Sequence, residues 1–160
     1  MNLAPDVTVA AIVERQGRFL LVEEQIQNRL VINQPAGHVE ADETLVAAVV
    51  REALEETAWR FMPRALLGTY LWRNPASGVP YLRFAFIGSV ADHDPDRVLD
   101  HPVVTTHWLT RAELAAQGSK LRSPMVLRCI DDYLAGQQLP LDSVASLDIE
   151  AALRVRAVSL

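Results

Sequence analysis

Short apolar runs separated by turn residues fill the first part of the chain, and this pattern predicts β-strands. The runs VTVAAIV, at residues 7–13, and RFLLVEE, at residues 18–24, flank a Gln-Gly turn and predict a β-hairpin. RLVINQPAG, at residues 29–37, predicts a short strand that Pro35 ends, followed by a loop. The N-terminal quarter of the chain is therefore expected to supply three strands.

A helical pattern follows these strands. Asp42 is the expected N-cap, because its carboxylate can accept hydrogen bonds from the first free backbone N–H groups of the helix. Glu43, in the expected first turn, suits the positive end of the helix dipole. The helix is predicted to run from Thr44 to about Thr57, and as far as Val50 it is apolar almost all the way round.

The second half of the chain again alternates strands with turns. ALLGTYLWRN, at residues 65–74, and PYLRFAFIGSV, at residues 80–90, predict two strands joined by a turn. The polar segment 91–102 predicts a loop, and VVTTHWLT, at residues 103–110, predicts another strand. Because strands and helices mix without a strict β-α-β alternation, the pattern favours an α/β (α+β) sandwich.

Two further helices are expected toward the C-terminus. Thr110 and Glu113 have the spacing of a capping box, which predicts a short helix. The segment 123–136 predicts a longer helix with Ser123 as N-cap, a proline at its first position and Gly136 as the stop.

Composition and charge narrow the class of protein. A chain of 160 residues, half of them hydrophobic, suggests one globular domain with a sizeable core. The net charge of -5 argues against nucleic acid or an anionic membrane as the main partner. Cys129 is the only cysteine, so a disulfide framework is excluded and a reducing, cytoplasmic location is expected. No apolar run approaches the roughly 18 residues of a membrane span.

Three glutamates crowd one sector of the predicted helix. Glu52 precedes Glu55 and Glu56 by three and four positions, so their side chains should project in similar directions. Like charges at this spacing repel each other, and the cost rises near an apolar core. Arg51 can offset the repulsion, and so can a divalent cation such as Mg²⁺ or Mn²⁺. A solvated acidic helix face, paired locally with Arg51, is the alternative interpretation.

The spacing of fixed residues from Gly37 to Trp59 resembles the Nudix box, G-x5-E-x7-R-E-U-x-E-E-x-G-U with U apolar. Glu43 and REALEETAW, at residues 51–59, match every charged position of that pattern. One position departs, because Ala58 stands where the family has a glycine that leaves the helix with positive φ. A non-glycine residue in that conformation costs about 1–2 kcal/mol. The departure therefore concerns the helix exit and leaves the carboxylates intact.

The resemblance implies a Nudix-type α/β/α sandwich with a mixed sheet and a loop-helix-loop catalytic motif. The domain is expected over residues 1–141, and a tail of uncertain structure over 142–160. The implied metal ligands are Glu52, Glu55, Glu56 and the carbonyl of Gly37. Glu52 is also the expected residue for polarising the attacking water. Arg51 and Glu43 lie two helical turns apart and are expected to form an ion pair that braces the loop against the helix.

Residues outside the box are candidates for substrate contact. Arg83 alternates with apolar residues along a strand, so it either meets a phosphate or is a solvent-facing charge. Asn33 and Gln34 either contact a base or are ordinary polar turn residues. Four strand aromatics can stack on a base but are more often core residues: Tyr70, Trp72, Tyr81 and Phe86.

Longer segments, among them NQPAGHVEADETL, YLRFAF and LRSP, resemble a bacterial phosphatase branch of the Nudix family. This implies a Mg²⁺-dependent hydrolase that releases orthophosphate from nucleoside di- and triphosphates, and from hydroxymethylpyrimidine diphosphate as a further candidate. One alternative is a Nudix pyrophosphatase that acts on ADP-ribose or another nucleotide. The other is a Nudix-fold module that binds a nucleotide without cleaving it. A monomer is expected, with a homodimer as the alternative.

Overall fold

The computed structural model describes residues 4–147. The strands are β1 (Asp6–Arg15), β2 (Arg18–Ile26), β3 (Arg29–Asn33), β4 (Ala36–His38), β5 (Arg60–Arg73), β6 (Pro80–Ala91), β7 (Val103–Leu109) and β8 (Leu139–Pro140). The α-helices are α1 (Leu45–Thr57), α2 (Arg111–Ala115) and α3 (Met125–Leu134), with short 3-10 turns η1 (Gly118–Lys120) and η2 (Leu141–Ser143).

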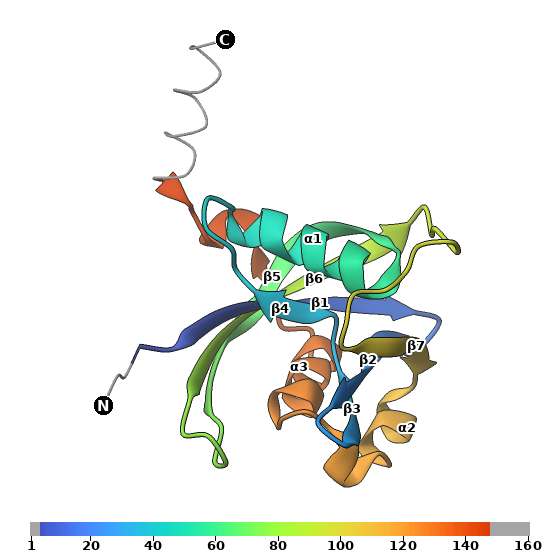
Figure 1. The fold of residues 1–160 in the computed structure, drawn as a ribbon. Coiled ribbons are helices and arrows are strands. Elements are labelled where there is room, and N and C mark those ends of the chain that lie inside the picture. The colour runs from blue at the N-terminus through green and yellow to red at the C-terminus, as the bar shows by residue number, and fades with distance from the viewer. Residues whose placement is uncertain (1–3, 148–160) are drawn as a thin grey trace.

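The strands form a mixed sheet of order β3-β2-β1-β6-β5-β8, with β4 paired to β1 and β7 paired to β2. β1 and β6 run parallel, whereas the other strand pairs of the described chain are antiparallel. α1 covers one face of the sheet and α3 covers the other (Figure 1). The predicted α/β/α sandwich with a mixed sheet is confirmed.

Alternation along β1 shows how one strand serves both layers. Val9, Ala11 and Val13 pack in the core cluster that contains the buried face of α1. Ala10 and Ile12 pack in the cluster that contains the buried face of α3. A strand buried on both faces must be apolar at every position, which explains the unbroken apolar run from Val9 to Val13.

The entry to α1 differs from the prediction in two places. The segment after Pro35 forms the short strand β4 instead of a loop. The N-cap of α1 is Thr44, whose hydroxyl accepts from Ala47 N at 3.0 Å, so the prediction of Asp42 as cap was wrong. Asp42 has a positive φ of 65° in the preceding turn, and Glu43 precedes the helix. A threonine two residues further on satisfies the helix end equally well, so spacing alone did not decide between them.

The exit from α1 keeps the left-handed conformation that the family's glycine would adopt. Ala58 has φ 59° and ψ 15°, and its N–H bonds to the carbonyl of Leu54. The conformation therefore persists at the cost of about 1–2 kcal/mol expected for a non-glycine residue. Ala58 is also buried, and its methyl group packs in the core.

The helices near the C-terminus are capped in different ways. The capping box of Thr110 and Glu113 is present as predicted. Gly136 ends α3 with a φ of 81°, and the bond from Gln137 N to Asp132 O completes a Schellman motif. Ser123 does not cap α3 with its side chain, contrary to the prediction, because its buried hydroxyl has no hydrogen-bond partner.

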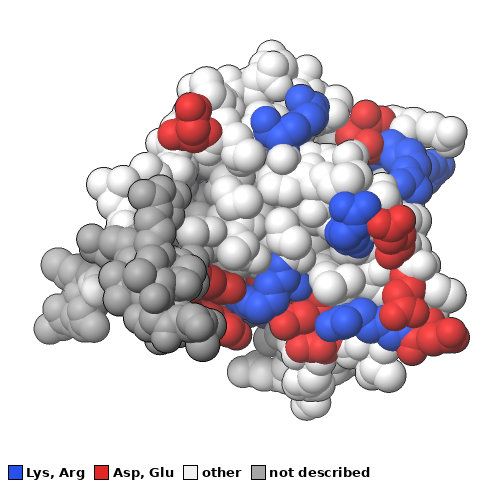
Figure 2. Space-filling model, turned by 90° about the horizontal axis from the view of Figure 1, so that it is seen from above, with Lys and Arg blue, Asp and Glu red and all other residues white. Residues whose placement is uncertain are grey.

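The surface on the α1 side carries charges of both signs. Figure 2 shows Lys and Arg side chains beside Asp and Glu side chains around a broad uncharged area. Across residues 4–147, no helix has the length and hydrophobicity needed to cross a membrane. Val144, in the described part of the expected tail, packs against the core cluster on this side, and residues 148–160 lie outside the described chain.

Candidate active site

A cleft of about 380 Å³ opens beside β4 and is lined by residues from both halves of the chain. Four glutamates line it, and three of them form what we call the acidic group: Glu24, Glu52 and Glu56. Its two arginines and the serine next to one of them form what we call the basic group: Arg83, Arg122 and Ser123. The cleft therefore brings potential cation ligands and potential anion ligands into one cavity.

Glu56 is the most perturbed carboxyl group of the cleft. Its side chain comes from the last turn of α1 and is buried, and one oxygen accepts from Ala36 N at 2.9 Å. Burial raises the pKa of Glu56 to about 9, and the nearby charges of Glu24 and Glu52 act in the same direction. Without a compensating cation, this group therefore favours its protonated form at neutral pH.

Glu24 is a site residue that the sequence analysis did not identify. It lies near the end of β2, is buried, and its Oε2 has no hydrogen-bond partner. Burial raises the pKa of this carboxyl group, against the opposing effects of Arg122 and Arg83. The sequence held little signal for it, because Glu24 lies in the polar end of β2, RFLLVEEQI, beside another glutamate, and no local pattern shows which of the two is buried.

Glu52 approaches the backbone of β4 closely. A Cβ atom at position 37 would collide with the carboxylate of Glu52, so any residue other than glycine would force that carboxylate out of its present position. Burial raises the pKa of Glu52, whereas the hydrogen bond from Arg51 lowers it. The glycine at position 37 thus leaves room for the carboxylate of Glu52 to approach the main chain of β4.

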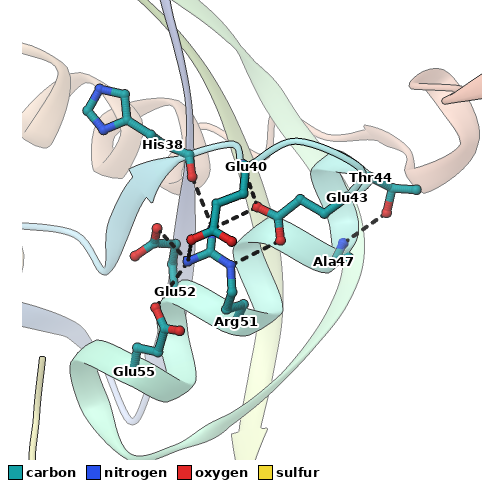
Figure 3. A network of polar contacts seen from close by, with 8 residues as sticks. All are labelled: His38, Glu40, Glu43, Thr44, Ala47, Arg51, Glu52 and Glu55. Carbon is teal, nitrogen blue, oxygen red and sulfur yellow. Dashed lines mark hydrogen bonds and ion pairs between the residues drawn. The ribbon is translucent and has the colours of Figure 1, made fainter. Parts of the chain in front are cut away.

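Arg51 is the centre of the polar network in Figure 3. It donates to both carboxylate oxygens of Glu43, at 3.0 and 2.7 Å, and to the carbonyl of His38 at 3.0 Å. Its Nη1 also donates to Glu52 at 2.9 Å and Glu55 at 3.0 Å. The predicted Arg51–Glu43 ion pair is confirmed, and it joins the loop before α1 to the middle of the helix. The hydrogen bond from Arg51 lowers the pKa of Glu43.

Glu55 does not line the cleft with Glu52 and Glu56, although all three lie on the same part of α1. Within residues 4–147, no three acidic, histidine or cysteine side chains are arranged as a ready metal site. The donor set nevertheless fits a divalent cation. The unpartnered Glu24 oxygen and the raised pKa values are what a cation with hard oxygen ligands would relieve.

Arg83, Asn33 and Gln34 are brought together at the floor of the cleft. Arg83 is buried and donates to Gln34 Oε1 at 2.8 Å and to Asn33 Oδ1 at 3.1 Å. Gln34 is also buried, does not line the cleft, and donates to Val126 O at 2.8 Å. Arg83 therefore lines the cleft with its guanidinium fixed by Gln34 and Asn33, and the interpretation of Arg83 as a solvent-facing charge was wrong.

The four candidate aromatics separate into two pairs. Trp72 and Tyr81 line the cleft and stack on each other, with ring centroids 6.0 Å apart and planes at 28°. Phe86 is fully buried in the core, and Tyr70 packs against the core and donates to Asp132. Only the first pair is placed to meet a ligand.

Comparison with known proteins assigns the class. Residues 3–129 match the model of the NUDIX domain. The chain belongs to the Nudix family, and it is a hydrolase that acts on phosphorus-containing anhydrides. Within the family it is similar to phosphatase NudJ of Escherichia coli K12, with 40% identity over 144 residues, covering 90% of this chain and 93% of NudJ. The resemblance to a bacterial phosphatase branch is thereby confirmed.

Two solved structures extend the comparison. A NUDIX hydrolase from Nitrosomonas europaea is 44% identical, with a TM-score of 0.88, over 91% of this chain and 99% of its own. A bifunctional NMN adenylyltransferase/ADP ribose pyrophosphatase from Francisella tularensis, solved with AMP and a manganese ion, is 18% identical. Its TM-score of 0.68, over 84% of this chain and 42% of its own, shows a shared fold.

Proposed function

We propose that this Nudix hydrolase is a Mg²⁺-dependent phosphatase that releases orthophosphate from nucleoside di- and triphosphates. The main support for the proposal is that one cleft contains both the acidic group, of which Glu24 and Glu56 are buried, and the buried guanidinium of Arg83. A phosphoanhydride bound with a cation supplies both the positive and the negative charges that this cleft lacks. Hydroxymethylpyrimidine diphosphate is a further candidate substrate, because it carries the same anhydride on a different ring.

The divalent cation, Mg²⁺ or Mn²⁺, is proposed to be held by Glu52, Glu56 and the Gly37 carbonyl, with Glu55 joining when Arg51 releases it. Glu24 is added to this set, because its free oxygen already faces the same group of carboxylates. When bound, the cation supplies a water of lowered pKa and neutralises the anionic phosphates. The manganese ion in the Francisella tularensis relative is consistent with this choice of metal.

The protein's own residues then position the reaction. Glu52 polarises and orients the attacking water, and Arg51 holds Glu52 at 2.9 Å and keeps it from moving away. Arg83 contacts a phosphate oxygen, with Asn33 beside it at the cleft. Gln34 acts as a positioning residue, because both ends of its amide are already bonded. Most of the catalysis would come from this orientation and from charge neutralisation.

Trp72 and Tyr81 are proposed to contact the base or pyrimidine ring of the substrate. Their stacked rings line the cleft: Tyr81 lies two residues before Arg83 on β6, and Trp72 lies opposite Tyr81 on β5. Two residues of a strand span about 6.6 Å, which is a suitable separation between a ring and its phosphate. Stacking on aromatic side chains tolerates different bases, so this contact does not restrict the enzyme to one nucleotide.

The test is a substrate panel with Mg²⁺ in which orthophosphate and pyrophosphate are measured separately. The panel contains nucleoside tri- and diphosphates, hydroxymethylpyrimidine diphosphate and ADP-ribose. Glu52→Gln is the inactive variant, and Asp142→Asn, which removes an exposed carboxylate outside the cleft, is the matched control. Metal-dependent orthophosphate release that is lost only in Glu52→Gln supports the proposal.

Two other outcomes would replace it. Release of pyrophosphate, or of two monophosphates from ADP-ribose, would make the enzyme a Nudix pyrophosphatase. Nucleotide binding without any turnover would make it a sensor module. The intact carboxylates of α1 argue against the sensor, because a protein that only binds has no need to keep a buried acidic group.

A further inference from the structure

The N-terminus of α3 opens into the cleft beside the basic group. Ser123 precedes the N-cap residue Pro124, Met125 follows it, and both Ser123 and Met125 line the cleft. α3 has 10 residues, and no side chain caps its N-terminus. The N–H of Val126 already bonds to the carbonyl of Ser123, so the helix dipole and the remaining first-turn N–H groups make this end favourable for an anion.

Ser123 provides an independent sign that a ligand belongs here. Its side chain is 6% exposed, yet its hydroxyl has no hydrogen-bond partner in the described chain. The guanidinium of Arg83 is not a second sign of this kind, because it interacts with the thiol of the buried Cys129, which does not line the cleft. Buried polar groups are nearly always bonded, so the unused hydroxyl of the cleft-lining Ser123 indicates a missing acceptor.

Arg122 adds a cation that is free to move toward a ligand. Its side chain is exposed and lines the cleft, while its backbone N–H is fixed to Ile32 O at 2.9 Å. The loop between η1 and α3 is thus anchored at the end of β3, next to the buried Asn33. The charge of Arg122 acts on Glu24, which places it near the acidic group.

We propose that Ser123, Arg122 and the N-terminus of α3 form a subsite for a terminal phosphoryl group with three free oxygens. This inference rests on the proposed function and gives it a physical basis for substrate choice. A phosphomonoester end offers about two negative charges and three acceptors, which match the free donors of the subsite. ADP-ribose has only internal, diesterified phosphates and fills the subsite less well.

Inorganic phosphate is the simplest probe, and its binding to the full chain is measured by calorimetry without substrate. Ser123→Ala should weaken phosphate binding about tenfold, as expected for loss of one hydrogen bond to a charged group. Arg122→Gln, at an exposed position that folding does not depend on, should weaken it by a similar factor. Ser119→Ala, at an exposed serine of η1 outside the cleft, is the matched control and should bind as the wild type does.

A second measurement separates binding from a structural effect. The KM for a nucleoside diphosphate should rise in Ser123→Ala while competitive inhibition by ADP-ribose, which lacks a terminal phosphoryl group, stays unchanged, whereas a merely structural role would weaken both. Unaltered phosphate affinity in both Ser123→Ala and Arg122→Gln, or no phosphate binding by the wild type, would overturn the subsite. Because phosphate binding requires no turnover, this result is independent of whether the proposed phosphatase activity is found.

Discussion

The acidic group and the basic group line the same cleft, but the protein holds them in opposite ways. Arg83 is buried with two of its nitrogens bonded to Gln34 and Asn33, so its position is fixed before a ligand arrives. Glu24 and Glu56 are buried with raised pKa values, and Glu24 has an oxygen without a partner, so their ionised forms are unfavourable in the metal-free protein. The guanidinium of Arg83 is thus held in place, whereas the ionised forms of Glu24 and Glu56 are destabilised by burial.

This difference indicates what each group does. A preorganised arginine binds a phosphate with little loss of conformational freedom. A divalent cation stabilises buried carboxylates strongly, because its attraction to their ionised forms offsets the free-energy cost of removing those charges from water. The acidic group should therefore control catalysis and metal dependence, and the basic group and ring pair should control affinity.

The largest effect should come from the acidic group. Glu52→Gln should lower kcat/KM roughly 10³-fold, because it removes several kcal/mol of charge stabilisation and the orientation of the water. The melting temperature of the metal-free variant should not fall, since burial disfavours the ionised side chain that is lost. Steady-state assays and thermal melts check both statements. Retention of more than a tenth of the activity would contradict the assignment of catalysis to this group.

Metal affinity should depend steeply on pH. Glu56 has a pKa raised to about 9 in the folded, metal-free protein, above its usual value of 4.5, so folding favours the protonated form. The contribution of Glu56 to the free energy of unfolding is therefore lost as pH rises from about 4.5 to 9. Because a cation must displace this proton, apparent Mg²⁺ affinity should rise about tenfold per pH unit between pH 6 and 8.

Calorimetric titration of Mg²⁺ at three pH values measures this slope. Glu56→Gln, which has no proton to release at this position, should show a smaller dependence on pH. Equal slopes in the two proteins would mean that Glu56 does not take part in the proton–metal exchange.

Removing Arg51, which bonds to Glu43, Glu52 and Glu55, should have a smaller effect than removing a carboxylate of the acidic group. Arg51→Gln breaks the bonds to Glu43, Glu52 and Glu55, and should lower the free energy of unfolding by about 2 kcal/mol. Arg60→Gln, which breaks the exposed pair with Asp92, is the control and should cost less than about 1 kcal/mol. Urea denaturation compares the two, and similar losses would refute the bracing role of Arg51.

The ring pair should affect affinity and leave the chemistry almost unchanged. Trp72→Ala should raise KM for nucleoside diphosphates about tenfold, as one base–aromatic contact is lost. Hydrolysis of inorganic tripolyphosphate, which has no ring, should be unchanged. Leu71→Ala, at the neighbouring position, is 72% exposed and outside the cleft, and serves as control. An equal effect of Trp72→Ala on both substrates would place its role in the fold of the hairpin.

The smallest effect should come from Ala58, the residue at which α1 ends, two positions after Glu56. Ala58→Gly relieves about 1–2 kcal/mol of left-handed strain but loses a buried methyl worth about 0.8 kcal/mol and frees the unfolded chain. The free energy of unfolding should therefore change by less than about 1 kcal/mol. Ala58→Val, a β-branched residue at positive φ, should be clearly destabilising. Thermal melts of both variants test whether the departure from the family glycine is tolerated because the methyl is buried.

Local sequence signals predicted most of the architecture. Alternation and turn residues indicated β1, β2, β5, β6 and β7, and the capping box located α2. They failed where two local solutions were equally good. Asp42 and Thr44 both suit an N-cap, and the turn that sets Asp42 at positive φ depends on how β4 pairs with β1. A three-residue strand has too little pattern to be distinguished from a loop.

Helical spacing and a fixed motif are local properties of the chain, so the amino-acid sequence was enough to indicate the acidic residues of α1 and the Arg51–Glu43 pair. Long-range packing brings Glu24 to the same cleft, buries Arg83 on Gln34 and Asn33, and leaves the hydroxyl of Ser123 unused. These residues meet because β1 and β6 lie side by side and α3 packs under them. Burial and hydrogen-bond partners depend on such long-range contacts, and no local pattern records them.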